Sequence, residues 1–438
     1  MIGLGLDEVA ALCDGALEAA PGSTHVTGVR VDSRLIEPGD LFVAVGAGSA
    51  FLADAREHGA AATLVPTDAF AGLAALGAAV RDRSDAQVVA ITGSTGKTST
   101  KDILAALCRP HARTIAAHAS FNNEIGTPLT LCRLEADTEV CILELAMRGF
   151  GQIAELAAIA RPQIGAITNV GPVHLELVET VEGVARAKAE LLRALPPGGT
   201  AIVPASAREL EPFLALDGVE VVRVGPDGDV RLIGLETGSR TTRLEVELGD
   251  DHVEVELNFT AQHHVDNALV ALAAYRALGL PLAEVGEGAR EIVFSPWRGE
   301  ELPLAGGGVL INDCYNANPI SMRAALTLLG TRAESRRRVA ILGDMAELGP
   351  DAPSYHVEVG AAAAELGVGA LVAIGPLARG YVDGAEGVEP AVWAATLEEG
   401  LEAAARIVEP GDCVLVKGSR AMGLEAVAEA LATEAVTS

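Results

Sequence analysis

The sequence predicts an α/β protein with three domains: a small N-terminal α/β domain, a central sheet of the P-loop type and a C-terminal Rossmann-like domain. Apolar clusters of strand length alternate with helical patterns along almost the whole chain, which favours mainly parallel sheets. The length of 438 residues calls for two to four domains at roughly 100 to 200 residues per domain. We therefore place the domains over residues 1–85, 86–297 and 298–438.

The predicted elements follow this division in order. In the N-terminal domain, a charged cluster ends the segment, and the expected elements are the strands Val26–Val31, Leu41–Val45 and Thr63–Val65 with a helical turn at Asp54–Ala60. In the central domain, buried apolar runs predict the strands Val88–Thr92, Val140–Leu145, Ile164–Val170 and Ala201–Val203. In the C-terminal domain, alternation with helical patterns predicts the strands Val309–Asn312, Val339–Leu342, Leu371–Ile374 and Val414–Val416.

A hairpin and a long helix complete the central domain. Apolar and polar residues alternate over 244–248 and again over 253–257, with Gly249-Asp250-Asp251 between them. This alternation and the turn residues predict a β-hairpin. A helix over about Gln262–Leu278 follows.

The composition excludes several classes of partner. The chain carries 60 Asp and Glu against 32 Lys and Arg, a net charge of −28, which repels nucleic-acid phosphates and anionic membranes. No uncharged apolar run reaches the roughly 20 residues of a membrane span, and residues 1–20 lack a basic leader segment. We expect a cytoplasmic protein without membrane insertion. Its six cysteines, far apart and without a C-x-x-C pair, should be reduced core thiols.

Lysine is rare in this chain. The only lysines are Lys97, Lys101, Lys188 and Lys417, so arginine supplies 28 of the 32 basic residues. Such a chain should keep lysine where a compact ammonium or a reactive amine is required, because a guanidinium cannot replace either.

The sharpest motif is a glycine loop between a strand and a helix. Gly93 and Gly96 would let the backbone approach phosphates, Lys97 could reach the β and γ oxygens, and Thr98 could ligate Mg²⁺. The loop is shorter than the usual P-loop, because Ile91 stands where the first glycine is expected. The plain alternative is a glycine-rich turn with a surface lysine. The loop consists of Gly93, Ser94, Thr95, Gly96, Lys97, Thr98 and Ser99.

Other polar residues follow strand ends, where ligands of α/β sheets collect. Glu144 could be a metal ligand or a solvent-facing glutamate, and His174 a ligand or an ordinary loop histidine. Lys188 has no helical ion-pair partner three or four residues away. His263 and His264, beside Asn267, could be metal ligands or core-facing caps. The pair Asn318-Pro319 is typical of the turn at a helix start, where proline is favoured, so it can be explained without a ligand.

Taken together, these motifs resemble the Mur ligase family, and the match runs in order over essentially the whole chain. Four runs are similar to the members of that family that add D-alanyl-D-alanine: Asn122–Gly126, Tyr315–Asn318, Gly343–Gly349 and Lys417–Arg420. Several ordered motifs are far more specific than one glycine loop.

The resemblance implies an ATP-dependent amide ligase. It would join D-Ala-D-Ala to UDP-MurNAc-tripeptide through an acyl phosphate, in peptidoglycan synthesis and hence cell wall formation, cell shape and division, and it would be a monomer. The third peptide residue could be diaminopimelate or lysine. Two other interpretations stay open: a related Mur or folylpolyglutamate-type ligase that adds a single amino acid, and a nucleotide-binding homologue without catalysis.

The resemblance also implies roles for individual residues. The glycine loop, Asn267, Arg298 and Asp313 would bind ATP, with Lys97 on the phosphates, Asn267 at the adenine, Arg298 at the γ-phosphate and Asp313 at the ribose. Thr98 and Glu144 would hold one Mg²⁺, and His174 with a carbamylated Lys188 would serve a second. The implied catalytic residues are Lys97, Lys188, His174, Glu144 and Arg298.

Substrate contacts are implied in all three domains. Asp32-Ser33-Arg34 would seat the UDP group, although Gly46–Asp54 lacks the Asp-Gly-His loop of the family, which leaves the UDP contacts open. The helix start Ala261–His264 also departs from the family's Gly-Arg-His-Asn, so we rank His263 below Asn267. The remaining implied substrate residues are Asn122, Asn123, Asn316, Asn318, Lys417, Ser419 and Arg420.

Overall fold

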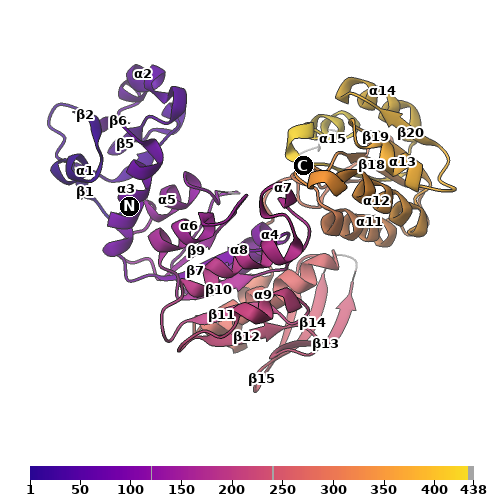
Figure 1. Cartoon of the computed structure of the whole chain (residues 1–438), viewed down its shortest axis with the longest axis horizontal. Coiled ribbons are helices and arrows are strands. Elements are labelled where there is room, and N and C mark those ends of the chain that lie inside the picture. The colour runs from indigo at the N-terminus through magenta and orange to yellow at the C-terminus, as the bar shows by residue number, and fades with distance from the viewer. Residues whose placement is uncertain (120, 239–240, 433–438) are drawn as a thin grey trace. The chain divides into compact units, whose positions relative to one another are not determined.

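The computed structural model describes residues 1–119, 121–238 and 241–432, and it confirms the α/β class (Figure 1). The chain forms two compact units, each built from segments that are not contiguous in the sequence. The first unit contains Met1–Asn169, Arg186–Phe259 and Asn267–Val293; the second contains Val170–Ala185, Thr260–Asp266 and the described residues from Phe294 onward. The three-domain division at residues 85 and 297 stays a prediction.

The N-terminal segment forms a four-stranded sheet in the order β2-β6-β5-β4. β5 is parallel to both β4 and β6, whereas β2 is antiparallel to β6. A two-residue strand β1 pairs with β3 outside this sheet. The elements are β1 Leu4–Gly5, α1 Leu6–Leu12, β2 Gly15–Ala19, β3 His25–Val26, β4 Gly28–Arg30, η1 Ser33–Leu35, β5 Asp40–Val43, η2 Gly46–Phe51, α2 Leu52–Glu57, β6 Ala62–Pro66 and α3 Ala69–Asp82.

Two features of this segment differ from the prediction. The single strand expected over 26–31 is broken at Thr27, whose N–H donates to the carbonyl of Gly39, so two strands in different sheets replace it. The sequence prediction also missed α3, which Asp68 caps by accepting from two backbone N–H groups. Its buried Leu73, Leu76 and Val80 recur at helical spacing, and the charged cluster at residues 81–85 begins within its last turn.

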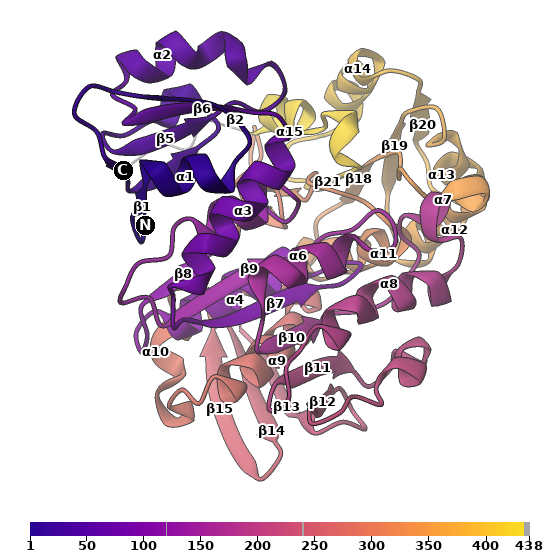
Figure 2. The ribbon, with the colours of Figure 1, turned by 60° about the vertical axis from the view of Figure 1, so that its left-hand side comes forward.

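The central sheet has nine strands in the order β15-β14-β13-β12-β11-β10-β7-β9-β8, with β7 in its parallel part between β10 and β9 (Figure 2). The apolar residues of β7 are fully buried, as expected for a strand covered on both faces. The elements of this part of the chain are β7 Gln87–Thr92, α4 Lys97–Cys108, β8 Thr114–Ala116, α5 Gly126–Leu131, β9 Val140–Glu144, α6 Gln152–Ala160, β10 Ile164–Ile167, α7 Leu175–Val178, α8 Val181–Arg193, β11 Thr200–Pro204, η3 Arg208–Phe213 and β12 Glu220–Val224.

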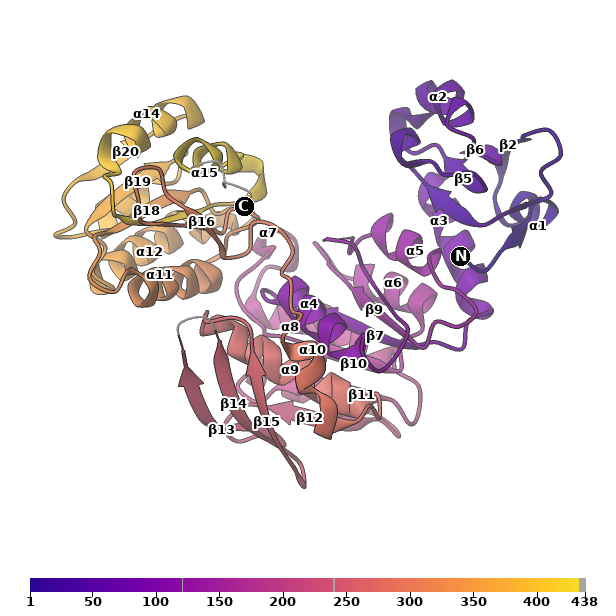
Figure 3. The same ribbon diagram turned by 180° about the vertical axis from the view of Figure 1, so that it is seen from behind.

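The predicted hairpin and long helix are confirmed. β13, β14 and β15 form an antiparallel extension of the central sheet (Figure 3). The hairpin turn is Gly249-Asp250, with Gly249 at φ +61°, and Asp251 pairs with Leu248 as the first residue of β15 rather than lying in the turn. The elements are β13 Val230–Thr237, β14 Thr242–Leu248, β15 Asp251–Leu257, α9 His263–Ala277, η4 Leu282–Glu284 and α10 Gly286–Ala289.

The C-terminal sheet has the strand order β16-β17-β21-β18-β19-β20, and all neighbours are parallel except β16 and β17. Helices α11 and α12 lie on one side of it and α14 and α15 on the other (Figure 1). The predicted Rossmann-like arrangement agrees with this layering. The elements are β16 Glu300–Pro303, β17 Val309–Asn312, α11 Pro319–Ala333, β18 Arg338–Gly343, η5 Gly349–Asp351, α12 Ala352–Glu365, β19 Ala370–Ile374, α13 Arg379–Gly384, β20 Ala391–Ala394, α14 Leu397–Ile407, β21 Cys413–Lys417, η6 Arg420–Met422 and α15 Glu425–Leu431.

Two further expectations concern the whole described chain. All six cysteines are buried and unpaired, as predicted for core thiols. Among the residues that the structure describes, no helix combines the length and the apolar character that a bilayer crossing needs.

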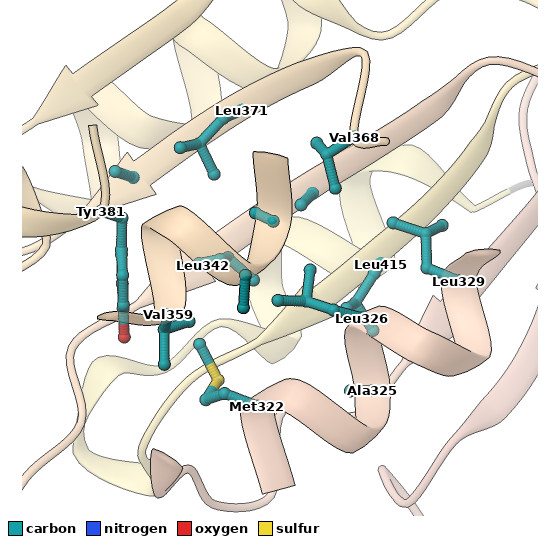
Figure 4. Packing of buried hydrophobic residues seen from close by; sticks show 14 of the residues in the cluster. Met322, Ala325, Leu326, Leu329, Leu342, Val359, Val368, Leu371, Tyr381 and Leu415 are labelled. Carbon is teal, nitrogen blue, oxygen red and sulfur yellow. The ribbon is translucent and has the colours of Figure 1, made fainter. Parts of the chain in front are cut away.

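The packing of α12 gives a matched test of the C-terminal core. Val359 is 3% exposed and points into the apolar cluster with Met322 and Leu342 (Figure 4), whereas Val357 on the same helix is 40% exposed. We expect Val359→Ala to lower the free energy of unfolding by about 2 kcal/mol, because it removes buried methyl groups and leaves a cavity. Val357→Ala should change it by less than about 0.5 kcal/mol. Denaturant unfolding checks both, and equal effects would contradict the packing.

Candidate functional site

The glycine loop lies between β7 and α4, as its sequence predicts. Gly96 precedes α4 in the left-handed conformation at φ +78°, a backbone position that favours glycine. Helix α4 begins at Lys97, so the N-terminal backbone N–H groups of this helix face the loop, an arrangement that suits an anion. The Nζ of Lys97 donates to the carbonyl of Gly93 at 2.8 Å. The ammonium therefore lies over the loop.

Two residues that the sequence analysis missed hold this loop from β10. The N–H of Thr95 donates to Oδ1 of Asn169 at 2.8 Å, and the N–H of Ser94 donates to the carbonyl of Asn169 at 3.2 Å. The hydroxyl of Thr168 donates to the carbonyl of Thr95. Because these two residues turn toward the loop, β10 ends at Ile167, three residues earlier than predicted. A polar pair at the end of an apolar run was the available signal.

Glu144, at the end of β9, brings predicted residues from three elements together. Its carboxylate is 1% exposed; Oε2 accepts from the hydroxyl of Thr98 at 2.7 Å and Oε1 from Nδ2 of Asn122 at 2.8 Å. Within the described part of the chain, the carboxylate has no Lys, Arg or His as an ion-pair partner. Two neutral donors leave a buried negative charge uncompensated, so the group suits a bound cation. The solvent-facing alternative for Glu144 is excluded.

Lys188 lies on α8 and is 2% exposed. Among the described residues its amine makes no hydrogen bond and no ion pair. Burial lowers the pKa of this amine well below its ordinary value, and the positive charge of Lys97 lowers it further. Burial and the neighbouring positive charge therefore both favour the neutral form of this amine.

Asn267 on α9 lies beside the glycine loop. It is 7% exposed, and its Oδ1 accepts from the hydroxyl of Thr100 at 3.4 Å. A Cβ atom added to Gly96 would come within 2.2 Å of the same oxygen. Asn123, by contrast, is occupied locally, because its side chain accepts from the N–H groups of Ile125 and Gly126 at the start of α5.

His174 belongs to the second unit and contacts the loop after β18. Its Nδ1 lies 2.5 Å from Oε2 of Glu347, and the N–H of Leu175 donates to the carbonyl of Glu347 at 3.2 Å. Both His174 and Glu347 have positive φ angles, +53° and +62°. The predicted partnership of His174 with Lys188 stays a prediction, since the two belong to different units.

The adjacent histidines at the start of α9 behave differently from metal ligands. His264 is 3% exposed and stacks on Phe294, with ring centroids 4.1 Å apart, and burial holds its pKa well below the ordinary value. Burial also lowers the pKa of His263. Over residues 1–119, 121–238 and 241–432, no three His, Cys, Asp or Glu side chains gather as an all-protein metal site. The packing favours the core-facing interpretation of His264.

Lys417 connects the ends of two strands in the C-terminal sheet. Its ammonium, 2% exposed, donates to Oδ2 of Asp313 at 2.7 Å and to the carbonyl of Asn316 at 2.9 Å. The guanidinium of Arg298 lies over the ring of Tyr315, 4.1 Å from its centroid. These contacts gather Arg298, Asp313 and Lys417 at the carboxyl ends of parallel strands.

The remaining predicted residues of this domain have local structural partners. Asn318 caps α11 through a reciprocal pair of hydrogen bonds with Ser321, which confirms the role of turn chemistry there. The hydroxyl of Ser419 accepts from the N–H of Ala346 at 2.9 Å. Arg420 lies over the ring of Trp297 and pairs with Glu425 at 2.5 Å.

Asp32-Ser33-Arg34 forms a compact turn before β5. The Asp32 carboxylate accepts from the backbone N–H of Arg34 at 3.0 Å and from its guanidinium at 2.9 and 2.6 Å. These hydrogen bonds lower the pKa of Asp32 to about 2. Arg34 keeps 82% of its side chain exposed, whereas Ser33 is buried. The turn therefore presents to solvent a guanidinium that is paired with the Asp32 carboxylate.

Two family models of known proteins match most of this chain. The family model for the Mur ligase middle domain matches residues 91–275, and the model for the Mur ligase, glutamate ligase domain matches residues 297–420. A UDP-N-acetylmuramoyl-tripeptide–D-alanyl-D-alanine ligase from Mycobacterium tuberculosis is 36% identical, over 99% of this chain and 98% of the relative.

Solved structures give the same picture. A crystal structure of MurF from Acinetobacter baumannii aligns with a TM-score of 0.85 at 28% identity, covering 97% of this chain and 98% of that one. MurF ligase from Thermotoga maritima, solved in complex with ADP, aligns with a TM-score of 0.77 at 25% identity, covering 92% of this chain and 96% of that one.

The close approach of Gly96 to Asn267 gives a test of the loop. We expect Gly96→Ala to weaken binding of an adenine nucleotide by at least about tenfold, because the methyl group would displace Asn267 and strain a left-handed backbone position. Gly151→Ala is the matched control: Gly151 precedes α6 at φ +87°, but no heavy atom lies within 4 Å of its added Cβ. Calorimetric titration measures both, and equal losses would mean that backbone strain alone is responsible.

Proposed function

This chain belongs to the Mur ligase family, and we propose that it joins D-Ala-D-Ala to UDP-MurNAc-tripeptide in an ATP-dependent reaction of peptidoglycan synthesis. The observation that carries the proposal is the identity of 36% over nearly the full length of a ligase with this activity. The reaction would run in the cytoplasm, where ATP and nucleotide-linked precursors are available. It would thereby contribute to cell wall formation, cell shape and division.

The chemistry divides into two steps. A carboxylate oxygen of the tripeptide attacks the γ-phosphorus of ATP, the bond to the bridging oxygen breaks, and ADP leaves an acyl phosphate. The amine of D-Ala-D-Ala then attacks the acyl carbon, loses a proton, and displaces phosphate as the amide bond forms. Three anionic groups must meet on a protein of charge −28, so local cations have to balance them.

For the first step, the glycine loop and Lys97 would hold the phosphates. Lys97 lies over the loop at hydrogen-bond distance from Gly93, and Asn267 lies beside Gly96 where it could meet the adenine. Arg298 would face the γ-phosphate and Asp313 the ribose. Asp313 is fixed by Lys417, which supports an ordered carboxylate in that role.

The oxygen atoms around Glu144 fit a magnesium ion. Thr98 and Glu144 would hold it, since both present oxygen, the ligand type that Mg²⁺ prefers. Bound there, the ion would supply positive charge to the phosphate oxygens. Asn122, which the resemblance implies as a substrate residue, would also keep the carboxylate oriented through its hydrogen bond.

Lys188 is proposed as the site of carbamylation, with His174 as the other residue of a second magnesium site. A neutral amine adds CO₂ to give an anionic carbamate and releases a proton, and an arginine cannot replace it. Burial without a partner and a lowered pKa support a neutral amine at this position.

Substrate contacts are proposed at the two ends of the chain. The exposed guanidinium of Arg34, in the turn with Asp32 and Ser33, could pair with the UDP phosphates. In the C-terminal domain, the substrate residues are proposed at the carboxyl ends of β17 and β21, where ligands of such sheets bind. These are Asn316, Asn318, Lys417, Ser419 and Arg420.

The activity can be tested by phosphate release with the full set of reactants. We expect release to require UDP-MurNAc-tripeptide, ATP, Mg²⁺ and D-Ala-D-Ala, and to fall to background when any one is omitted. A screen of single amino acids as acceptors is the control for the related ligases. Release with a single amino acid but not with D-Ala-D-Ala would overturn the proposal, and no release with any acceptor would favour a homologue without catalysis.

Replacing Lys188 tests the carbamate. Lys188→Arg keeps a positive charge but cannot be carbamylated, so we expect ligation to fall by at least about 100-fold. Binding of ATP should stay within about threefold, because Lys97 and the glycine loop are unchanged. Turnover measured beside calorimetric binding separates the two effects, and unchanged turnover would remove the carbamate from the mechanism.

A further inference from the structure

Lys101 is the one lysine for which the proposed reaction has no use. It lies on α4, three residues after Thr98 and therefore on a neighbouring position of the same helix face. Its side chain is 3% exposed. Since nearly all basic residues of this chain are arginines, a buried lysine in the central domain suggests a position that arginine cannot fill.

The ammonium of Lys101 has two hydrogen-bond acceptors and one ion-pair partner. It donates to the carbonyls of Ala117 at 2.9 Å and Ala119 at 2.8 Å, and it pairs with Oδ1 of Asp102 at 3.0 Å. A compact ammonium can meet three oxygen atoms from different directions around one nitrogen. The planar fork of an arginine could not converge on three acceptors around one point.

The two carbonyls belong to the segment that carries Asn122. Ala119 is a non-glycine residue at φ +46°, a backbone conformation that costs free energy and needs support from its surroundings. The segment is fixed before this turn, where the N–H of Ala117 donates to the carbonyl of Ile142. It is fixed again after the turn, where the carbonyl of Asn122 accepts from the N–H of Ala146 at 2.8 Å. Lys101 holds the backbone of this segment at Ala117 and Ala119.

We propose that Lys101 is a positioning residue for the magnesium site, acting on Glu144 through the turn at Ala119 and the side chain of Asn122. The two donors to Glu144 then both depend on α4, because Thr98 bonds to it directly and Asn122 is placed by Lys101. Loss of the ammonium would release the turn, and Asn122 would no longer orient the carboxylate. This inference rests on the proposed use of Mg²⁺ and ATP.

Binding of the non-hydrolysable analogue AMPPNP, titrated with and without Mg²⁺, tests the inference without turnover. In Lys101→Met we expect the gain in affinity from Mg²⁺ to fall by about 10- to 100-fold, the usual loss when a residue supporting a metal ligand is removed. Affinity without the metal should stay within about threefold, because the glycine loop is untouched. Arg133→Met is the control, since the exposed Arg133 donates to the neighbouring carbonyl of Ala116 at 2.9 Å.

A merely structural role would lower the unfolding temperature of Lys101→Met and leave the gain from Mg²⁺ unchanged in the folded protein. That result would overturn the inference, as would the absence of any gain in the unaltered protein. If Lys101→Met does not fold, Asn122→Ala removes the side chain through which Lys101 is proposed to act and should show the same loss of gain from Mg²⁺, and an unchanged gain there would overturn the inference. A protein that binds AMPPNP with Mg²⁺ as expected but fails to ligate would overturn the proposed function and not the role of Lys101.

Discussion

The buried carboxylate of Glu144 is the constraint on which the rest of the site depends. A charged group that is 1% exposed is costly unless its surroundings compensate for the lost water. The chain supplies two neutral donors, Thr98 and Asn122, and no cationic side chain among the described residues. The donors fix the direction of the carboxylate but leave its charge, an arrangement that suits the proposed role of Glu144 as a ligand of Mg²⁺. Helix α4, strand β9 and the segment before α5 must therefore keep their relative positions.

The four lysines show how composition carried information about the site. Lys101, Lys188 and Lys417 are each 2% exposed, and Lys97 lies over the glycine loop. Lys101 and Lys417 point a compact ammonium at backbone carbonyls and a carboxylate, whereas the buried amine of Lys188 has no hydrogen bond or ion pair among the described residues. Arginine instead occupies exposed positions such as Arg34. Scarcity identified these positions because each demands a group that the planar guanidinium does not offer.

What the sequence predicted well was local or periodic. The buried run of β7, the hairpin turn at Gly249-Asp250 and the cap of α11 at Asn318 follow from neighbouring residues. What it missed was long-range. The hold of Thr168 and Asn169 on the glycine loop spans more than 70 residues, and the break at Thr27 depends on a bond to Gly39. The sequence analysis missed α3 because the segment is rich in Ala and Gly, which makes the apolar stripe of the helix weak.

The contact between His174 and Glu347 shows why spacing could not assign the histidine. The two residues are 173 positions apart, and each holds a left-handed backbone that costs about 1–3 kcal/mol. Such strain persists only where the surroundings fix it, and here the backbone and side chain of Glu347 both bond to the histidine segment. A carboxylate on Nδ1 sets the tautomer and the orientation of an imidazole ring. The loop after β18 therefore sets the orientation of the His174 ring. The sequence analysis noted His174 because it follows a strand of the central sheet, but the residue that orients its ring follows a strand of the C-terminal sheet.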